Sequence, residues 1–288
     1  MATGIGQLQT SNLFSLNAMR VQTNKLSTSL AQLASGSRLV NAAIDPSGLA
    51  ISNGFRAQLG GIDQAVYNAQ DAISVTRTAD SALDTQGDIL NRMRDLSVRA
   101  SNDATLNDSD RARLNTEFQS LSAELNRQGR STSFNTKQLT TDAPGQTYGT
   151  QAAQVGPNNG TNNQIAVTID ASTADTLGGG AGNKISDLDI STTAGAQNAI
   201  DVVSQAIDQV SSQRAALGVK EKTLDYAIND LSAQRINMSA ANSRIADTNM
   251  AEAFTSATTS KLLQQVSMAT LSQNKAQAWG ILKLIGSV

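Results

Sequence analysis

The chain of 288 residues contains no cysteine and no histidine. Without cysteine no disulfide can form. Without histidine, a histidine-based catalytic triad, an HExxH zinc motif and the commonest zinc ligand are excluded. Carboxylate chemistry is still possible, but the acidic residues are scattered along the chain and fit solvated helix faces or helix caps. We therefore expect no enzymatic activity, no metal and no cofactor.

Aromatic residues make up only 3% of the chain, charged residues 16%, and the formal net charge is -2. No basic patch is present, which argues against a nucleic-acid partner. No apolar run is long enough to span a membrane, so we expect no membrane insertion. The first residues, MATGIGQLQTSNLF, lack the basic and apolar segments of a secretory signal, so we expect any export to use another route.

The chain has only three prolines, Pro46, Pro144 and Pro157, and all lie outside the long helix-periodic stretches. Both ends of the chain are helix-periodic, whereas the middle is polar and rich in Gly and Asn. A helix with an apolar stripe must bury it, and each end has no obvious partner except the other. We predict a mainly α fold, in which both ends build a long antiparallel helical coiled-coil bundle and the central segment is small and β-rich.

A heptad pattern with Ile200 as position a covers the C-terminal half of the chain. Such a sustained pattern predicts a coiled-coil helix. Several a positions are polar, and they either set the register or lie at the edge of the stripe. For Arg214 and Arg235 we favour the edge, where their stems cover apolar surface. The d positions, which we predict to form the coiled-coil core, are all apolar: Val203, Val210, Leu217, Leu224, Leu231, Met238 and Ile245.

Matching helices are predicted in the N-terminal half, with one apolar stripe from Ile62 to Leu96 and another from Leu114 to Leu125. Asn107 or Asp108 can cap the second of these helices, and Gly129 marks its expected end. In the middle, apolar residues alternate with polar ones over NQIAVTIDAS, which predicts a strand. Asn107, Asn159 and Asn237 each begin a formal glycosylation sequon, a short and weak signal.

The two extreme ends carry apolar stripes, around Leu26–Leu33 and Leu262–Leu271, that a monomer would not bury easily. Exposed apolar surface of this kind marks an interaction site. We expect three domains: a terminal coiled-coil domain (1–40 with 250–288), a helical rod (41–131 with 196–249) and a short β-rich tip (132–195).

Longer motifs on both arms resemble those of the bacterial flagellins. The N-terminal motifs are SGSRLVNAAIDPSGLAIS (35–52), NAQDAISVTRTADSALD and LNRMRDLSVRAS; the C-terminal motifs are SQRAALG (212–218) and SAANSRIADTNMAEAFTSATTSKLLQQVSMATLSQ (239–273). The order and spacing of these motifs agree with the family, and the central segment matches nothing in particular. Two departures are the segment Asp45-Pro46-Ser47-Gly48 and the tail from Gly280 onward.

The resemblance implies a structural protomer that self-assembles into the helical flagellar filament used for motility. It also implies export through the flagellar type III apparatus without a cleaved signal peptide, and an extracellular location. The implied partners are further copies of the chain, an export chaperone, and the hook-associated and cap proteins. One alternative is the hook-filament junction protein, although the SRIxDxxMAE and LLQQ patterns favour flagellin. Another is an enzyme carried on a flagellin scaffold, against which the lack of histidine argues.

The segment LNRMRDLSVRAS is similar to the flagellin segment that Toll-like receptor 5 recognises. Arg92, Leu96 and Glu117 fall on the matching positions. They are therefore a candidate contact patch for the receptor or for another protomer. The alternative is that Leu96 packs in the interior, while Arg92 and Glu117 serve contacts between protomers.

Overall fold

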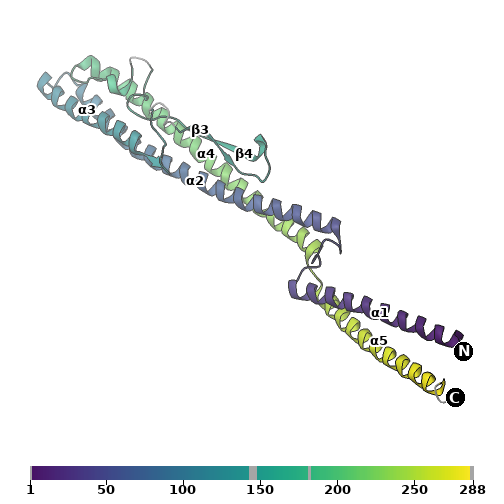
Figure 1. Cartoon of the computed structure of the whole chain (residues 1–288). Coiled ribbons are helices and arrows are strands. Elements are labelled where there is room, and N and C mark those ends of the chain that lie inside the picture. The colour runs from purple at the N-terminus through teal and green to yellow at the C-terminus, as the bar shows by residue number, and fades with distance from the viewer. Residues whose placement is uncertain (1, 143–147, 181–182, 286–288) are drawn as a thin grey trace. The chain divides into compact units, whose positions relative to one another are not determined.

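The computed structural model describes residues 2–142, 148–180 and 183–285, and five long helices dominate this part of the chain (Figure 1). In chain order these are α1 (Ala2–Ser35), α2 (Pro46–Ala100), α3 (Asp108–Ser131), α4 (Thr193–Ala246) and α5 (Met250–Ile285). Four short strands lie between α3 and α4: β1 (Ser133–Phe134), β2 (Lys137–Gln138), β3 (Gly149–Gln154) and β4 (Gln164–Ile169). The predicted mainly α fold with a small β-rich centre is confirmed.

Contacts between residues divide the chain into two compact units. The terminal unit contains residues 1–57 and 236–288, and the central unit contains residues 58–235. The long helices α2 and α4 each contribute to both units. The division into three domains (1–40 with 250–288, 41–131 with 196–249, and 132–195) stays a prediction.

In the terminal unit, α1 and α5 run side by side in opposite directions (Figure 1). Polar bonds link them along their length: Gln264 Nε2 donates to Thr23 Oγ1 at 3.0 Å, and Asn274 Nδ2 donates to Ser11 Oγ at 3.2 Å. Residue numbers that rise on one helix fall on the other, as an antiparallel pair requires. The pairing of the two chain ends is therefore a direct helix-helix contact.

The chain leaves α1 through Gly36, whose φ of +68° lies in the left-handed region that favours glycine. The next residues pair with the segment between α4 and α5. The N–H of Arg38 donates to the carbonyl of Ala246 at 2.7 Å, and the N–H of Thr248 donates to the carbonyl of Gly36 at 2.9 Å. These bonds hold the end of α1 and the start of α5 together.

The departure at Asp45-Pro46-Ser47-Gly48 is a helix start. Asp45 Oδ1 accepts a bond from the N–H of Gly48 at 2.8 Å, which is the role of a capping residue. Pro46 is the first residue of α2, where its missing N–H costs nothing. A side chain at position 48 would overlap the Asp45 carboxylate, so Asp45 could then remain the cap only by shifting.

The core of the central unit is built from α2, α3 and α4 with the β segment packed against them. Its largest fully buried side chains include Phe118, Ile62, Leu83, Leu90, Met93 and Leu125. Asn107 is the cap of α3, and its Oδ1 accepts from the N–H of Asp110 at 2.9 Å. The helix does not end at Gly129 as expected but continues to Ser131. Glycine at position 129 instead permits a close approach, since an added Cβ would lie 2.7 Å from Thr173 Cγ2 and 3.2 Å from the carbonyl of Ser172.

The predicted strand is β4, which pairs antiparallel with β3 from Gly149↔Ile169 to Gln154↔Gln164. Val167 and Ile169 point into the core of the central unit and are buried. At the base of the connecting loop, the N–H of Val155 donates to the carbonyl of Asn163 at 2.8 Å. On the α2 side, Asn68 Nδ2 donates to the carbonyl of Gln154 at 3.1 Å, which fixes the hairpin to the helix.

Candidate interaction surfaces

Large apolar side chains point away from the α1–α5 contact. Phe14 is 77% exposed, Phe254 66% and Trp279 75%. Exposed apolar surface of this extent is unusual on a monomer and marks an interaction surface. The other exposed large apolar side chains of these two helices are Leu13, Leu16, Val21, Leu30, Leu262, Leu263, Val266 and Met268.

Small residues form the buried seam between these two helices. Ser29 is buried on α1, and Ala253, Ala257 and Ser260 are buried on α5, at successive helical spacings along one face. Small side chains let the two backbones approach closely but bury little apolar area. The helix pair is thus held by its seam, while its large apolar residues are available to other molecules.

The heptad d positions of α4 all turn inward. Val203, Val210, Leu217, Leu224 and Leu231 are buried, and Leu224 has no exposed surface. Met238 and Ile245, which belong to the terminal unit, are half-buried. Val203, Val210, Leu217 and Leu224 share one continuous core with apolar residues of α2.

The polar a positions of α4 in the central unit pair with charged residues on α2. Arg214 Nε lies 2.9 Å from Asp80 Oδ1, and its Nη1 lies 2.6 Å from Asp84 Oδ1. The hydrogen bond with Asp80 raises the pKa of Arg214. Further along, Glu221 pairs with Arg77 at 2.6 Å.

Arg235 extends this series, with its Nε 2.6 Å from Asp63 Oδ1. Its side chain is 58% exposed and that of Arg214 is 37% exposed, so both lie at the edge of the apolar stripe. In the terminal unit, the a position Asn242 accepts a 2.8 Å bond from Ser52 of α2. Exposed pairs of this kind contribute about 0–1 kcal/mol each, so their main effect is to set the register of α4 on α2.

The predicted contact patch is divided between surface and interior. Arg92 on α2 and Glu117 on α3 form an ion pair, with Arg92 Nη2 2.5 Å from Glu117 Oε1. Their side chains are 54% and 43% exposed. Leu96 is buried in the core of the central unit, so it offers no apolar surface beside this pair.

Sequence reasoning missed Arg111, the buried cation at the start of α3. Its side chain is 5% exposed, and its three donor nitrogens each have a partner. Nε donates to the carbonyl of Ala100, the last residue of α2, at 3.2 Å; Nη1 lies 3.0 Å from Asp108 and Nη2 2.5 Å from Asp103. Arg111 therefore joins the end of α2, the connecting loop and the first turn of α3.

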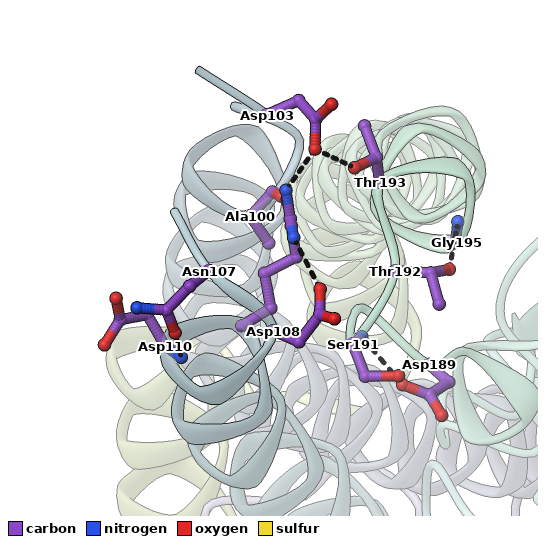
Figure 2. Close-up of polar contacts among 11 residues, drawn as sticks. Ala100, Asp103, Asn107, Asp108, Asp110, Asp189, Ser191, Thr192, Thr193 and Gly195 are labelled. Atoms are coloured by element: carbon purple, nitrogen blue, oxygen red, sulfur yellow. Dashed lines mark hydrogen bonds and ion pairs between the residues drawn. The ribbon is translucent and has the colours of Figure 1, made fainter. Parts of the chain in front are cut away.

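Asp103 carries this network on to α4 (Figure 2). Its Oδ1 also accepts a 3.1 Å bond from Thr193, the first residue of α4, and Thr192 caps that helix by accepting from the N–H of Gly195. A signal for Arg111 was present in the sequence. It lies one heptad before Phe118 and two before Leu125, which places it on the buried face of α3.

The described residues contain no group of three or more acidic side chains arranged to hold a metal ion. Nor does any described helix have the length and apolar character needed to cross a membrane. The central unit presents pairs of oppositely charged side chains at its surface, and the terminal unit presents exposed large apolar side chains.

Comparison with known proteins identifies the family of the chain. Residues 8–143 match the bacterial flagellin N-terminal helical region, and residues 200–285 match the C-terminal helical region. A flagellin of Halalkalibacterium halodurans is 37% identical over 95% of this chain and 98% of its own length. A flagellin of Bacillus subtilis is 36% identical over 98% of each chain.

Among solved structures, a putative flagellar hook-associated protein from Vibrio parahaemolyticus has a TM-score of 0.58 and 13% identity, covering 71% of this chain and all of its own. At that identity the likeness concerns the fold alone. The family matches and the near-full-length similarity to curated flagellins decide the assignment. This chain belongs to the bacterial flagellin family.

Proposed function

We propose that this flagellin polymerises through the outward apolar faces of α1 and α5. Flagellins are structural protomers of the extracellular flagellar filament, which drives motility, so self-association is a property of the family. The observation that carries the proposal is the exposed apolar surface that includes Phe14, Phe254 and Trp279, beside a seam made of small residues. Covering one such side chain in a neighbouring copy stabilises the polymer by about 1.5–3 kcal/mol.

The proposal is tested with Phe254→Ser. Phe254 is 66% exposed, so its replacement should leave the monomer folded. It should raise the monomer concentration needed for polymerisation by about tenfold or more, since each 1.4 kcal/mol changes an association constant tenfold. The matched control is Thr258→Ser, an exposed position one turn further along α5 that loses only a methyl group.

Sedimentation of polymer from monomer, with electron microscopy of the pellet, measures both variants against wild type. An unchanged critical concentration for Phe254→Ser would count against the proposed surface. Loss of polymerisation in Thr258→Ser as well would mean that assembly responds to any change in α5 and not to apolar area.

The resemblance to flagellins also supports finer expectations. Export through the type III apparatus without a cleaved signal, and binding to an export chaperone, to hook-associated proteins and to the cap, would each use the terminal helices before or during assembly. A structural role without enzymatic activity agrees with the family and with the lack of histidine and cysteine.

A second proposed function is recognition of the monomer by Toll-like receptor 5 through Arg92 and Glu117. The observation that favours it is that these two side chains are exposed and held together across α2 and α3, as a fixed pair of opposite charges. Leu96 would act indirectly, because it is buried and positions this part of α2.

Arg92→Ala should then weaken signalling in a Toll-like receptor 5 reporter assay with little change in thermal unfolding. Arg77→Ala is the matched control, because Arg77 is also an exposed arginine of α2 that pairs with a glutamate, Glu221. Equal signalling by Arg92→Ala and wild type would exclude the patch. Equal losses in both arginine variants would point to a general charge effect.

A further inference from the structure

The chain contains two Asn-Gly pairs, Asn53-Gly54 and Asn159-Gly160. In such a pair the backbone nitrogen of glycine can attack the side-chain carboxamide carbon of the asparagine before it. Glycine offers the least steric hindrance to this attack, because it has no side chain and the widest range of backbone conformations. Whether the attack occurs then depends on how firmly the surrounding backbone is held.

Asn159 lies in the loop between β3 and β4, and it is exposed. Neither its side chain nor the N–H of Gly160 makes a hydrogen bond within the described ranges of the chain. Gly160 has a φ of +141°, which only glycine adopts readily. The backbone nitrogen of Gly160 and the carboxamide of Asn159 thus make no hydrogen bond among the described residues, and both lie outside helices and strands.

Asn53 is equally exposed, but it lies inside α2, seven residues after the helix begins at Pro46. In a helix each such N–H is bonded to the carbonyl four residues earlier, and φ and ψ are confined to the helical region. Attack by the nitrogen of Gly54 would require local opening of the helix. Both Asn-Gly pairs are therefore exposed and open to the same reaction, but only the backbone of Asn53-Gly54 is held in a helix.

We propose that Asn159 is a site of spontaneous covalent modification, by deamidation through a succinimide, and that Asn53 is protected. The nitrogen of Gly160 forms a bond to Cγ of Asn159, its proton passes to the leaving amide nitrogen, and ammonia departs. Water then opens the five-membered ring. Attack at Cγ yields aspartate, and attack at the backbone carbonyl carbon yields isoaspartate. One water is consumed and one ammonia released, and nothing is oxidised or reduced.

The product adds one carboxylate, which changes the formal net charge from -2 to -3. The new charge is at the exposed end of the loop. The base of that loop is held by the bond between Val155 and Asn163, and Pro157 lies against Gly61 of α2. The modification therefore alters surface charge and local backbone length without requiring any change in the helical core. In a homopolymer the same site is present on every copy.

The experiment follows both sites in the same sample. Purified full-length protein is incubated at mildly alkaline pH and physiological temperature, digested with trypsin at intervals, and analysed by mass spectrometry with fragmentation. Cleavage after Arg38 and Arg56 releases the peptide 39–56 with Asn53, and cleavage after Lys137 and Lys184 releases 138–184 with Asn159. Fragment ions assign the mass change to Asn159 and not to the neighbouring Asn158.

We expect Asn159 to deamidate at least about tenfold faster than Asn53, since each tenfold in rate corresponds to about 1.4 kcal/mol of barrier and helix opening adds at least that much. Equal rates, or a faster rate at Asn53, would overturn the proposal. In urea at a concentration that unfolds the helices, the two rates should converge. A ratio that persisted there would assign the difference to local sequence and not to the fold.

A variant supplies an independent readout by isoelectric focusing. The more acidic species that accumulates in wild type should be lost in Asn159→Gln, because glutamine would have to form a larger, less favourable ring. Asn159→Asp marks the position of the deamidated protein from the start. Accumulation of the same acidic species in Asn159→Gln would place the modification elsewhere and refute the assignment.

Discussion

Replacing the buried Arg111 with alanine should destabilise the central unit more than replacing any of its exposed arginines with alanine. The guanidinium is 5% exposed and donates to the carbonyl of Ala100, a residue with no exposed surface. Leaving a buried carbonyl without a partner costs about 1–3 kcal/mol. Asp103 and Asp108 are 79% and 99% exposed, so each ion pair adds only about 0–1 kcal/mol. With the lost packing of the arginine stem, the expected destabilisation is about 2–4 kcal/mol.

Urea unfolding followed by far-ultraviolet circular dichroism measures this loss. Arg113→Ala is the matched control, because Arg113 is an exposed arginine two residues further along α3, and its replacement should cost less than about 0.5 kcal/mol. Arg111→Met separates the contributions, since methionine keeps the apolar stem and removes only the donors. Its cost should therefore lie between those of the alanine variant and the control.

Salt provides a further check on the assigned causes. At about 1 M ionic strength the Debye length falls to about 3 Å, which weakens the pairs with the exposed carboxylates but not the buried bond to Ala100. The loss in Arg111→Ala should therefore stay above about 1 kcal/mol in high salt. A loss below about 0.5 kcal/mol at low salt, or one abolished by salt, would refute the argument that the buried hydrogen bond dominates.

Other substitutions test the rest of the structure. Leu224→Ala should cost about 2–5 kcal/mol in urea unfolding because Leu224 is fully buried, and a loss well under about 1 kcal/mol would contradict its core position. Gln86→Leu should raise stability by about 1 kcal/mol, because neither amide atom has a partner among the described residues; destabilisation would reveal a buried water bound there. Gly218→Ala should stabilise α4 by about 0.5–1 kcal/mol, because its added methyl meets nothing within 4 Å; a lower free energy of unfolding would contradict this open position. Deleting residues 1–40 or 250–288 should abolish filaments in electron microscopy but leave the central helices folded by circular dichroism, and normal filaments from both truncations would reject the assembly role of the ends.

The sequence by itself determined the helical class, because that class follows from local periodicity. It also indicated the pairing of the two ends, because each end carries an apolar stripe and has no other obvious partner. A heptad repeat marks the buried face of α4 whichever partner covers it, and the alternation of Ile165, Val167 and Ile169 marks a strand in the same way. The cap at Asn107 was also predictable, since capping depends on residues only three positions apart.

Tertiary structure alone decided which polar residues face which partners. Arg214 meets Asp80 and Asp84 from a position more than a hundred residues away, and no local pattern specifies that register. Leu96 lies inside while Arg92, one turn before it, is exposed and paired with Glu117 of α3, and their spacing on one helix does not specify this difference. Arg111 was not singled out from the sequence; its heptad spacing from Phe118 places it on the buried face of α3, but only the tertiary structure brings it to the carbonyl of Ala100. Periodicity fixes the face that a residue occupies, but its partners depend on how separate helices are brought together.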